Sequence, residues 1–139
     1  MKTDIRVLEI EPIFKKEKLY TPLKFGNGVV EENTSLKVRV KVENGFGKVA
    51  QVWGNILLSD LWAYPDPLIS HEKKDEVMRE ISRRFCRFIG DSKIFAHPLD
   101  FYFEVEEDFF RISQQVRKDL KLTREIPALA TLVCASPID

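Results

Sequence analysis

The stretch LKVRVKVENGFGKVAQVWGNILL, residues 36–58, decides the fold. Over residues 36–43 an aliphatic side chain stands at every even position and a charged one at every odd position. Successive side chains of a strand point to opposite faces, so this alternation predicts a half-buried strand of an antiparallel sheet. The NGFG at 44–47 predicts a tight turn, because Asn and Gly accept positive φ at little cost. We therefore expect two strands, at about 35–44 and 48–58.

A further strand is expected before this stretch, at about residues 4–16. Its aliphatic residues are Ile5, Val7, Leu8, Ile10 and Ile13. Pro12 indicates an edge strand or a bulge because proline lacks a backbone donor. The segment YTPLKFGNGVVEENT, residues 20–34, contains Pro22, Gly26 and Gly28 and is interpreted as an ordered but mobile loop. Together these segments predict a three-stranded antiparallel meander.

Helices are expected after the strands. Ser70 suits the N-cap and Gly90 the end of a helix at about 70–90. Pro98 suits the first position of a second helix, at about 98–121. The segment 126–135 is apolar nearly all round, so we expect it to be buried on every side. Strands followed by helices without alternation indicate the α+β class, a three-stranded meander followed by a helical bundle.

The composition excludes several functional classes. The 139 residues include 22 basic and 22 acidic ones, so no net field favours nucleic acid or an anionic membrane. The apolar runs are too short to span a bilayer. The beginning, MKTDIRVLEIEP, is charged and lacks the apolar stretch of a signal peptide. We expect a cytoplasmic protein with no nucleic-acid or membrane partner.

The sequence contains no recognisable catalytic or metal-binding motif. His71 and His97 are expected at the surface or as capping residues, and Cys86 and Cys134 as buried free thiols. The acidic run at 104–108 spreads its carboxylates round a helix, which is typical of a solvated face. We therefore expect no catalytic residue, no metal ligand and no cofactor in this chain.

Two segments are unusual for structural loops. TPLKFGNGVV and VWGNILLSDLWAYPDP both carry aromatic and polar side chains that a simple turn does not need. Buried aromatics can serve as core packing with polar tips that find partners. Alternatively, the two segments meet on one side of the sheet and cover a ligand pocket. The candidate substrate-binding residues are Lys24, Phe25, Trp53, Asn55, Trp62 and Tyr64.

The order of two segments resembles a known family. TPLKFGNGVVEENTSLKVRVKVENGFGKVAQVWGN, residues 21–55, is similar to the long first loop, second strand, glycine turn and third strand of the N-terminal capping domain of the enolase superfamily, in its mandelate racemase/muconate lactonizing enzyme branch. IPALATLVCASPID, residues 126–139, is similar to the apolar helix that leads from that cap into a barrel domain. The resemblance implies a capping domain over 1–125, with 126–139 leading into a barrel that is absent here.

The resemblance also implies a division of labour. In such enzymes the β/α barrel holds Mg²⁺ with three carboxylates and supplies the acid/base residues, and the cap closes over a small carboxylate substrate. The parent protein would be an isomerase or lyase, acting as a racemase, cycloisomerase or dehydratase, and this chain alone would be inactive. Its implied partners are the barrel of the same protein, the substrate and a possible second copy of itself.

This sequence departs from the family pattern where substrate choice is made. Many relatives have an acidic residue near Trp53 and Gly54, whereas this chain has Gln51 and Asn55 nearby. The aromatic extension at 57–67 is also uncommon, so the substrate class stays open.

Two other interpretations stay open beside the capping domain. One is a stand-alone α+β module in which Trp53, Trp62 and Tyr64 line a small-molecule pocket. The other is a structural subunit that uses the apolar segment 126–135 as its interface.

Overall fold

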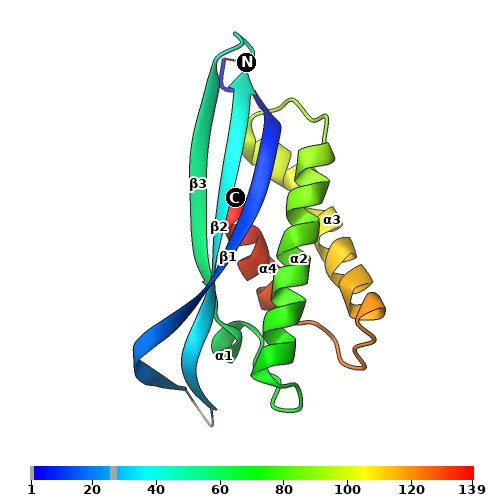
Figure 1. Ribbon diagram of the computed structural model, residues 1–139. Helices are drawn as coiled ribbons and strands as arrows, with labels where there is room; N and C mark the ends of the chain where they lie inside the picture. The colour runs from blue at the N-terminus through cyan, green and yellow to red at the C-terminus, as the bar shows by residue number, and fades with distance from the viewer. Residues whose placement is uncertain (1, 26–27) are drawn as a thin grey trace.

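Three antiparallel strands form one sheet in the order β1-β2-β3, and the long helices pack on one of its faces (Figure 1). The computed structural model describes residues 2–25 and 28–139. The prediction of an α+β fold with a three-stranded meander followed by helices is confirmed. The elements are β1 (Ile5–Phe25), β2 (Gly28–Asn44), β3 (Val49–Leu58), α1 (Asp60–Ala63), α2 (His71–Asp91), α3 (Pro98–Asp119), α4 (Ala128–Ala135) and the 3₁₀ helix η1 (Ser136–Ile138).

The alternation of aliphatic and charged residues at 36–43 sets the two faces of the sheet. Leu36 and Val38 are buried against the helices, whereas Lys37 is exposed on the opposite face. The turn between β2 and β3 is confirmed as well. The side chain of Asn44 accepts hydrogen bonds from the amides of residues 46 and 48, and Gly47 adopts a φ of 74°. That positive φ is the conformation for which glycine is favoured.

The loop predicted at residues 20–34 is wrong. The chain instead continues β1 to Phe25 and starts β2 at Gly28, with Lys18 paired to Glu32 and Lys24 paired to Val29. The register shifts between residues 18 and 23, and Pro22 lies within this irregular stretch. Because β1 is an edge strand, a proline without a backbone donor is tolerated there. Gly26, which also suggested a loop, lies outside the described residues.

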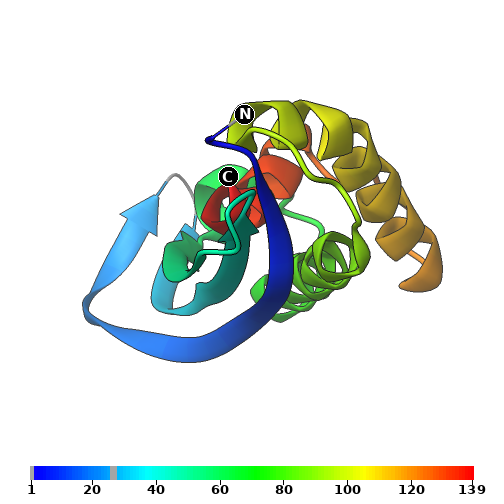
Figure 2. The ribbon, with the colours of Figure 1, turned by 90° about the horizontal axis from the view of Figure 1, so that it is seen from above.

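The β1–β2 hairpin extends beyond the end of the third strand. β3 ends at Leu58, opposite Thr34 of β2, so residues 17–25 and 28–33 extend past the third strand. We call these residues the hairpin arm. Figure 2 shows the arm bending away from α2 and α3, round the side of the molecule where α1 lies. This end of the molecule therefore combines a projecting hairpin with the turn that follows β3.

The predicted helix starts are confirmed by their caps. The Ser70 hydroxyl accepts a hydrogen bond from the amide of Lys73 at 3.2 Å, and Pro98 is the first residue of α3. Helix α2 ends at Asp91, one residue after the predicted Gly90, and is capped by Ser92. Gly90 has a different role: a Cβ there would lie 3.1 Å from Cγ2 of Ile10, so glycine allows α2 to approach β1 closely.

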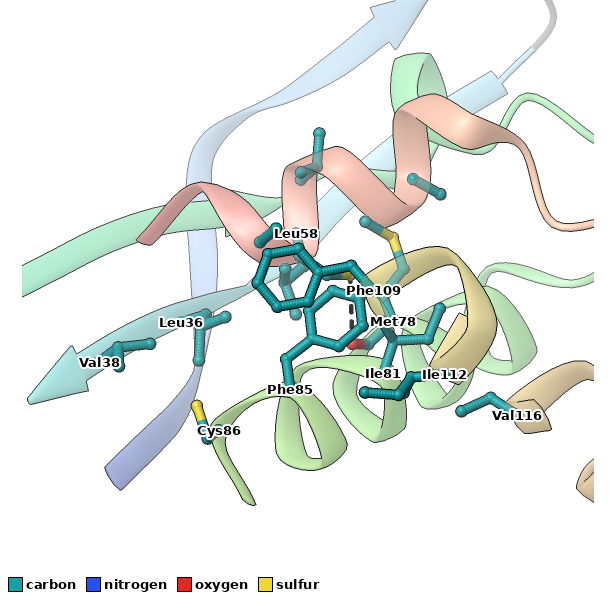
Figure 3. Packing of buried hydrophobic residues seen from close by; sticks show 14 of the residues in the cluster. Leu36, Val38, Leu58, Met78, Ile81, Phe85, Cys86, Phe109, Ile112 and Val116 are labelled. Atoms are coloured by element: carbon teal, nitrogen blue, oxygen red, sulfur yellow. Dashed lines mark hydrogen bonds between the residues drawn. The ribbon is translucent and has the colours of Figure 1, made fainter. Parts of the chain in front are cut away.

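The core lies between the sheet and the helices. The rings of Phe85 in α2 and Phe109 in α3 stack with centroids 4.5 Å apart, and aliphatic side chains of β2 close the layer from the sheet side (Figure 3). Cys86 and Cys134 are buried free thiols, as predicted. Burial raises the pKa of both thiols to about 12, so at neutral pH they remain unreactive packing groups.

Helix α4 is only partly enclosed, so the expectation of burial on every side is wrong. One face packs on α2, and Thr131 donates a hydrogen bond to the Ser113 hydroxyl of α3 at 2.8 Å. Leu129 and Leu132, one turn apart, are exposed. In the part of the chain that the structure describes, no helix has the length and apolar character that crossing a membrane requires.

Candidate functional site

The candidate binding residues do not converge on one point of this chain. Lys24 lies near the end of the hairpin arm and is exposed. The backbone of Phe25 ends β1, and its side chain lies outside the described set. Trp53 and Asn55 lie in the middle of β3, and Trp62 and Tyr64 follow that strand. Their substrate-binding role stays a prediction.

Trp53 belongs to the face of the sheet that points away from the helices. It pairs with Arg39 of β2, and its side chain is 54% exposed. The guanidinium of Arg39 lies 3.1 Å from a carboxylate oxygen of Glu11 and 3.3 Å from one of Glu9. Lys41 and, less strongly, Arg39 lower the pKa of Glu9. The same guanidinium donates to Oε1 of Gln51 on β3 at 3.3 Å, so Trp53 borders a charged network that joins all three strands.

The two aromatic residues after β3 differ sharply in burial. Trp62 on α1 is 45% exposed, whereas Tyr64 is 0% exposed and packs in the core. Burial, with a smaller contribution from the Asp66 carboxylate, raises the pKa of Tyr64. The packing interpretation therefore fits Tyr64, and Trp62 is the aromatic of this turn that remains available to a ligand.

The hairpin arm carries apolar side chains into solvent. Tyr20 is fully exposed, and Leu23 and Val29 are exposed as well. Within the described part of the chain, the Lys24 ammonium has no ion-pair partner. Exposed apolar side chains beside the Lys24 ammonium are suited to contact a ligand or another protein surface. A hairpin end with only a structural role would not need them.

A buried ionic cluster, which the sequence analysis missed, positions the turn after β3. Nδ1 of His71 donates to Oδ1 of Asp60 at 2.8 Å, and Nζ of Lys74 lies 3.4 Å from Oδ2 of the same carboxylate. Lys74 also donates to the carbonyl oxygen of Tyr64 at 3.1 Å. These bonds tie α1 to the start of α2. The one available signal was the spacing of His71 and Lys74, which places them on one face of a helix.

An apolar cavity of about 360 Å³ opens between the sheet and α3. Of the three aromatic residues predicted to line a small-molecule pocket, Trp53 borders this cavity, whereas Trp62 and Tyr64 do not. Val42 and Val52 line it from the sheet, Phe101 and Tyr102 from α3, and Ile138 from the end of the chain. Burial, with the nearby Asp139 carboxylate, raises the pKa of Tyr102. A cavity of this size and lining suits an apolar ligand or an apolar segment of protein.

No metal site is formed by the residues that the structure describes: no three or more His, Cys, Asp or Glu among them are grouped to hold an ion.

Comparison with known proteins found only a distant structural similarity. No protein-family model and no curated protein matches the chain. Among solved structures, it is similar to a crystal structure of enolase from Bradyrhizobium complexed with magnesium and mandelic acid, with 14% sequence identity and a TM-score of 0.47. The similarity covers 79% of this chain and 26% of the other, so this chain spans about a quarter of that enzyme's length.

Proposed function

We propose that this chain is the substrate-capping and specificity domain of a Mg²⁺-dependent enolase-superfamily enzyme, inactive without its barrel. The parent reaction would be a racemisation, cycloisomerisation or dehydration of a carboxylate substrate. Two features support the proposal. The segments at 21–55 and 126–139 resemble such a cap in their order, and the meander followed by helices is the fold that this resemblance implies.

The hairpin arm is the observation that carries the proposal. It extends past β3 and exposes Tyr20, Leu23 and Val29. Burial of apolar area is favourable by roughly 25 cal/mol per Å². A second surface that covers these side chains would therefore stabilise the assembled protein. A cap that closes over a substrate supplies such a surface and excludes water from the reaction.

Lys24 and Trp62 are the residues that best suit contact with the substrate. Lys24 offers a cation that can form a charge-assisted hydrogen bond with a carboxylate. Trp62 offers an exposed aromatic face on the turn held by the Asp60–His71–Lys74 cluster. The Mg²⁺ ion would belong to the barrel, and we assign no ligand to it in this chain.

The coding sequence that follows Asp139 gives the first test. An in-frame β/α barrel with carboxylates at successive strand ends supports the capping role. A stop codon directly after Asp139 contradicts it. If a barrel follows, the complete protein should turn over carboxylates in a Mg²⁺-dependent assay, and the 139-residue chain should not.

The apolar cavity favours a second candidate, a stand-alone module that binds an apolar small molecule. This hypothesis predicts saturable binding of an apolar small molecule to the 139-residue chain. Val52→Trp, which would fill the cavity, should abolish that binding, whereas Val49→Trp on the other face of β3 should not. Saturable binding that survives Val52→Trp would contradict this use of the cavity.

A further inference from the structure

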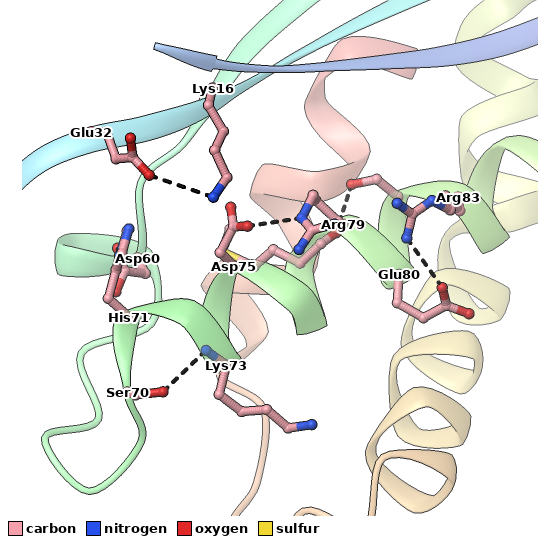
Figure 4. A network of polar contacts seen from close by, with 12 residues as sticks. Lys16, Glu32, Asp60, Ser70, His71, Lys73, Asp75, Arg79, Glu80 and Arg83 are labelled. Carbon is pink, nitrogen blue, oxygen red and sulfur yellow. Dashed lines mark hydrogen bonds and ion pairs between the residues drawn. The ribbon is translucent and has the colours of Figure 1, made fainter. Parts of the chain in front are cut away.

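A small polar pocket of about 80 Å³ lies between the base of the hairpin arm and the N-terminal part of α2 (Figure 4). It is separate from the apolar cavity and from the exposed side of the arm. Side chains of the first two strands form one wall, and side chains of α2 form the other. The lining residues are Lys16, Glu32, Asn33, Thr34, His71, Glu72, Asp75 and Arg79.

Two buried oxygen acceptors in this pocket have no donor among the described residues. Asn33 is 3% exposed and its Oδ1 is unpaired, and Asp75 is 7% exposed with its Oδ1 unpaired. The other carboxylate oxygen of Asp75 accepts from Nε of Arg79 at 2.8 Å. Buried polar groups in native proteins are nearly always hydrogen-bonded, so two unpaired acceptors around one space indicate a missing donor.

His71 also belongs to the lining. Its Nδ1 must carry the hydrogen, because the Asp60 carboxylate 2.8 Å away can only accept. In the neutral imidazole the other ring nitrogen, Nε2, is then an acceptor. The pocket is thus rich in acceptors, and a ligand with several N–H donors matches it.

The charges of the lining favour a single positive charge on that ligand. Three carboxylates (Glu32, Glu72 and Asp75) stand against two cations (Lys16 and Arg79), which leaves one formal negative charge with a neutral His71. Lys16 is paired with Glu32 at 3.5 Å, and Arg79 with Asp75 at 2.8 Å. Each resident cation therefore already has a carboxylate partner.

We propose that this pocket binds an ammonium group with at least three N–H bonds, either the ammonium ion itself or a short primary alkylammonium. Its N–H groups donate to Oδ1 of Asn33 and Oδ1 of Asp75, and its charge balances the excess carboxylate. The volume admits only a few non-hydrogen atoms. Because Asn33 belongs to β2 and Asp75 to α2, the bound ligand joins the arm to the helix. This site does not depend on the capping role.

Amide NMR of the ¹⁵N-labelled 139-residue chain provides a direct test. Ammonium chloride or methylammonium chloride replaces sodium chloride at constant ionic strength. We expect saturable shifts confined to residues 32–34 and 71–79. Potassium chloride should give none, and tetramethylammonium chloride should give none because it has no N–H donor. Absence of saturation, which would leave water as the occupant, overturns the proposal, as does an equal response to potassium.

Variants locate the binding. Asn33→Leu removes one acceptor and Asp75→Asn removes the charge, and each should weaken ammonium binding roughly tenfold or more, because hydrogen bonds to charged groups are among the stronger ones. Glu76→Gln is the matched control on α2, outside the lining, and should bind like the wild type. Asn33→Asp should bind more tightly. Unchanged affinity in Asn33→Leu contradicts the site, and this holds even if Asp75→Asn does not fold.

Discussion

Nδ1 of His71 lies 2.8 Å from Oδ1 of the buried Asp60, and this bond fixes the first residue of α2 to the first residue of α1. The second oxygen of Asp60 faces Nζ of Lys74, which is itself buried. A buried charge pair contributes less than its Coulomb energy because both ions lose their hydration. The loss of one partner is costly, however, since the other charge is left buried alone.

Asp60→Ala should therefore strongly destabilise the chain. We expect the free energy of unfolding to fall by about 3–5 kcal/mol, because Lys74 would lose its carboxylate partner. Urea denaturation measures this change. Glu76→Ala, which removes an ion pair with Lys73 on the more exposed side of the same helix, is the control and should cost about 0–1 kcal/mol. Equal effects of the two substitutions would contradict the structural role of Asp60.

The parts of the fold that were predicted correctly are those determined by residues close together in the sequence. Residues 36–43 alternate and face a single core, and Ser70 and Pro98 mark helix starts by chemistry confined to one turn. The hairpin arm was missed because Pro22 and the nearby glycines suggested a loop, whereas pairing with a distant strand decided the outcome. The exposed position of Trp62 and the burial of Tyr64, two residues apart, also depend on packing that no local pattern shows.

Gly54 should tolerate no side chain. A Cβ at this position would lie 1.9 Å from the carbonyl oxygen of Pro137, which is backbone and cannot rotate away. Gly54→Ala should lower the free energy of unfolding by about 2 kcal/mol or more, because the end of the chain must move off β3. Gly45→Ala is the control: its nearest atom, in the Phe95 ring, would be 3.4 Å away. A thermal melt of Gly54→Ala that matches the wild type would show that η1 does not pack there.

The ion pair between Arg84 of α2 and Asp119 of α3 should make stability depend on pH. The Arg84 guanidinium, 2.6 Å away, together with Gln115 lowers the pKa of Asp119 below its usual 3.8. Because the folded state holds the carboxylate ionised, this contribution is present above the ordinary pKa and is lost as the pH falls through the lowered one.

The matched variant for this pair is Asp119→Asn. Urea denaturation at neutral pH should show the wild type to be more stable than the variant, and the difference should shrink as the pH falls through the lowered pKa of Asp119 and vanish below it. A difference that persists at acid pH would mean that the asparagine perturbs packing, and not charge.

Mg²⁺ should bind this chain no better than scattered surface carboxylates do. A tight site needs several converging oxygens, and the described residues offer no such grouping. Titration calorimetry of the 139-residue chain should show no saturable heat. One stoichiometric, submillimolar site would contradict the assignment of the metal to another part of the parent protein.

Lys24 and Trp62 should affect substrate selection in the complete enzyme and leave the stability of the cap unchanged. Lys24 is exposed on the hairpin arm and, within the described chain, pairs with no acid, so its removal takes no contact from the fold. With a carboxylate substrate it would form a charge-assisted hydrogen bond of about 1.5–3 kcal/mol. Lys24→Ala should then lower kcat/KM roughly 10- to 100-fold with an unchanged Tm. Lys18→Ala, on the same arm, is the control and should leave both values unchanged.

Trp62→Ala tests whether the Trp62 side chain contributes to the fold or to the substrate pocket. The side chain is 45% exposed, so part of its area contacts the protein and part is open to a ligand. If it lines the substrate pocket, kcat/KM falls while Tm moves by only a few degrees.

Tyr64→Phe is the informative comparison, because Tyr64 is wholly buried with its hydroxyl unpaired among the described atoms. Removing that hydroxyl should leave kcat/KM unchanged and raise Tm slightly, since an unsatisfied buried polar group is lost. A Trp62→Ala protein whose Tm falls by many degrees would place Trp62 in the core and remove it from the site.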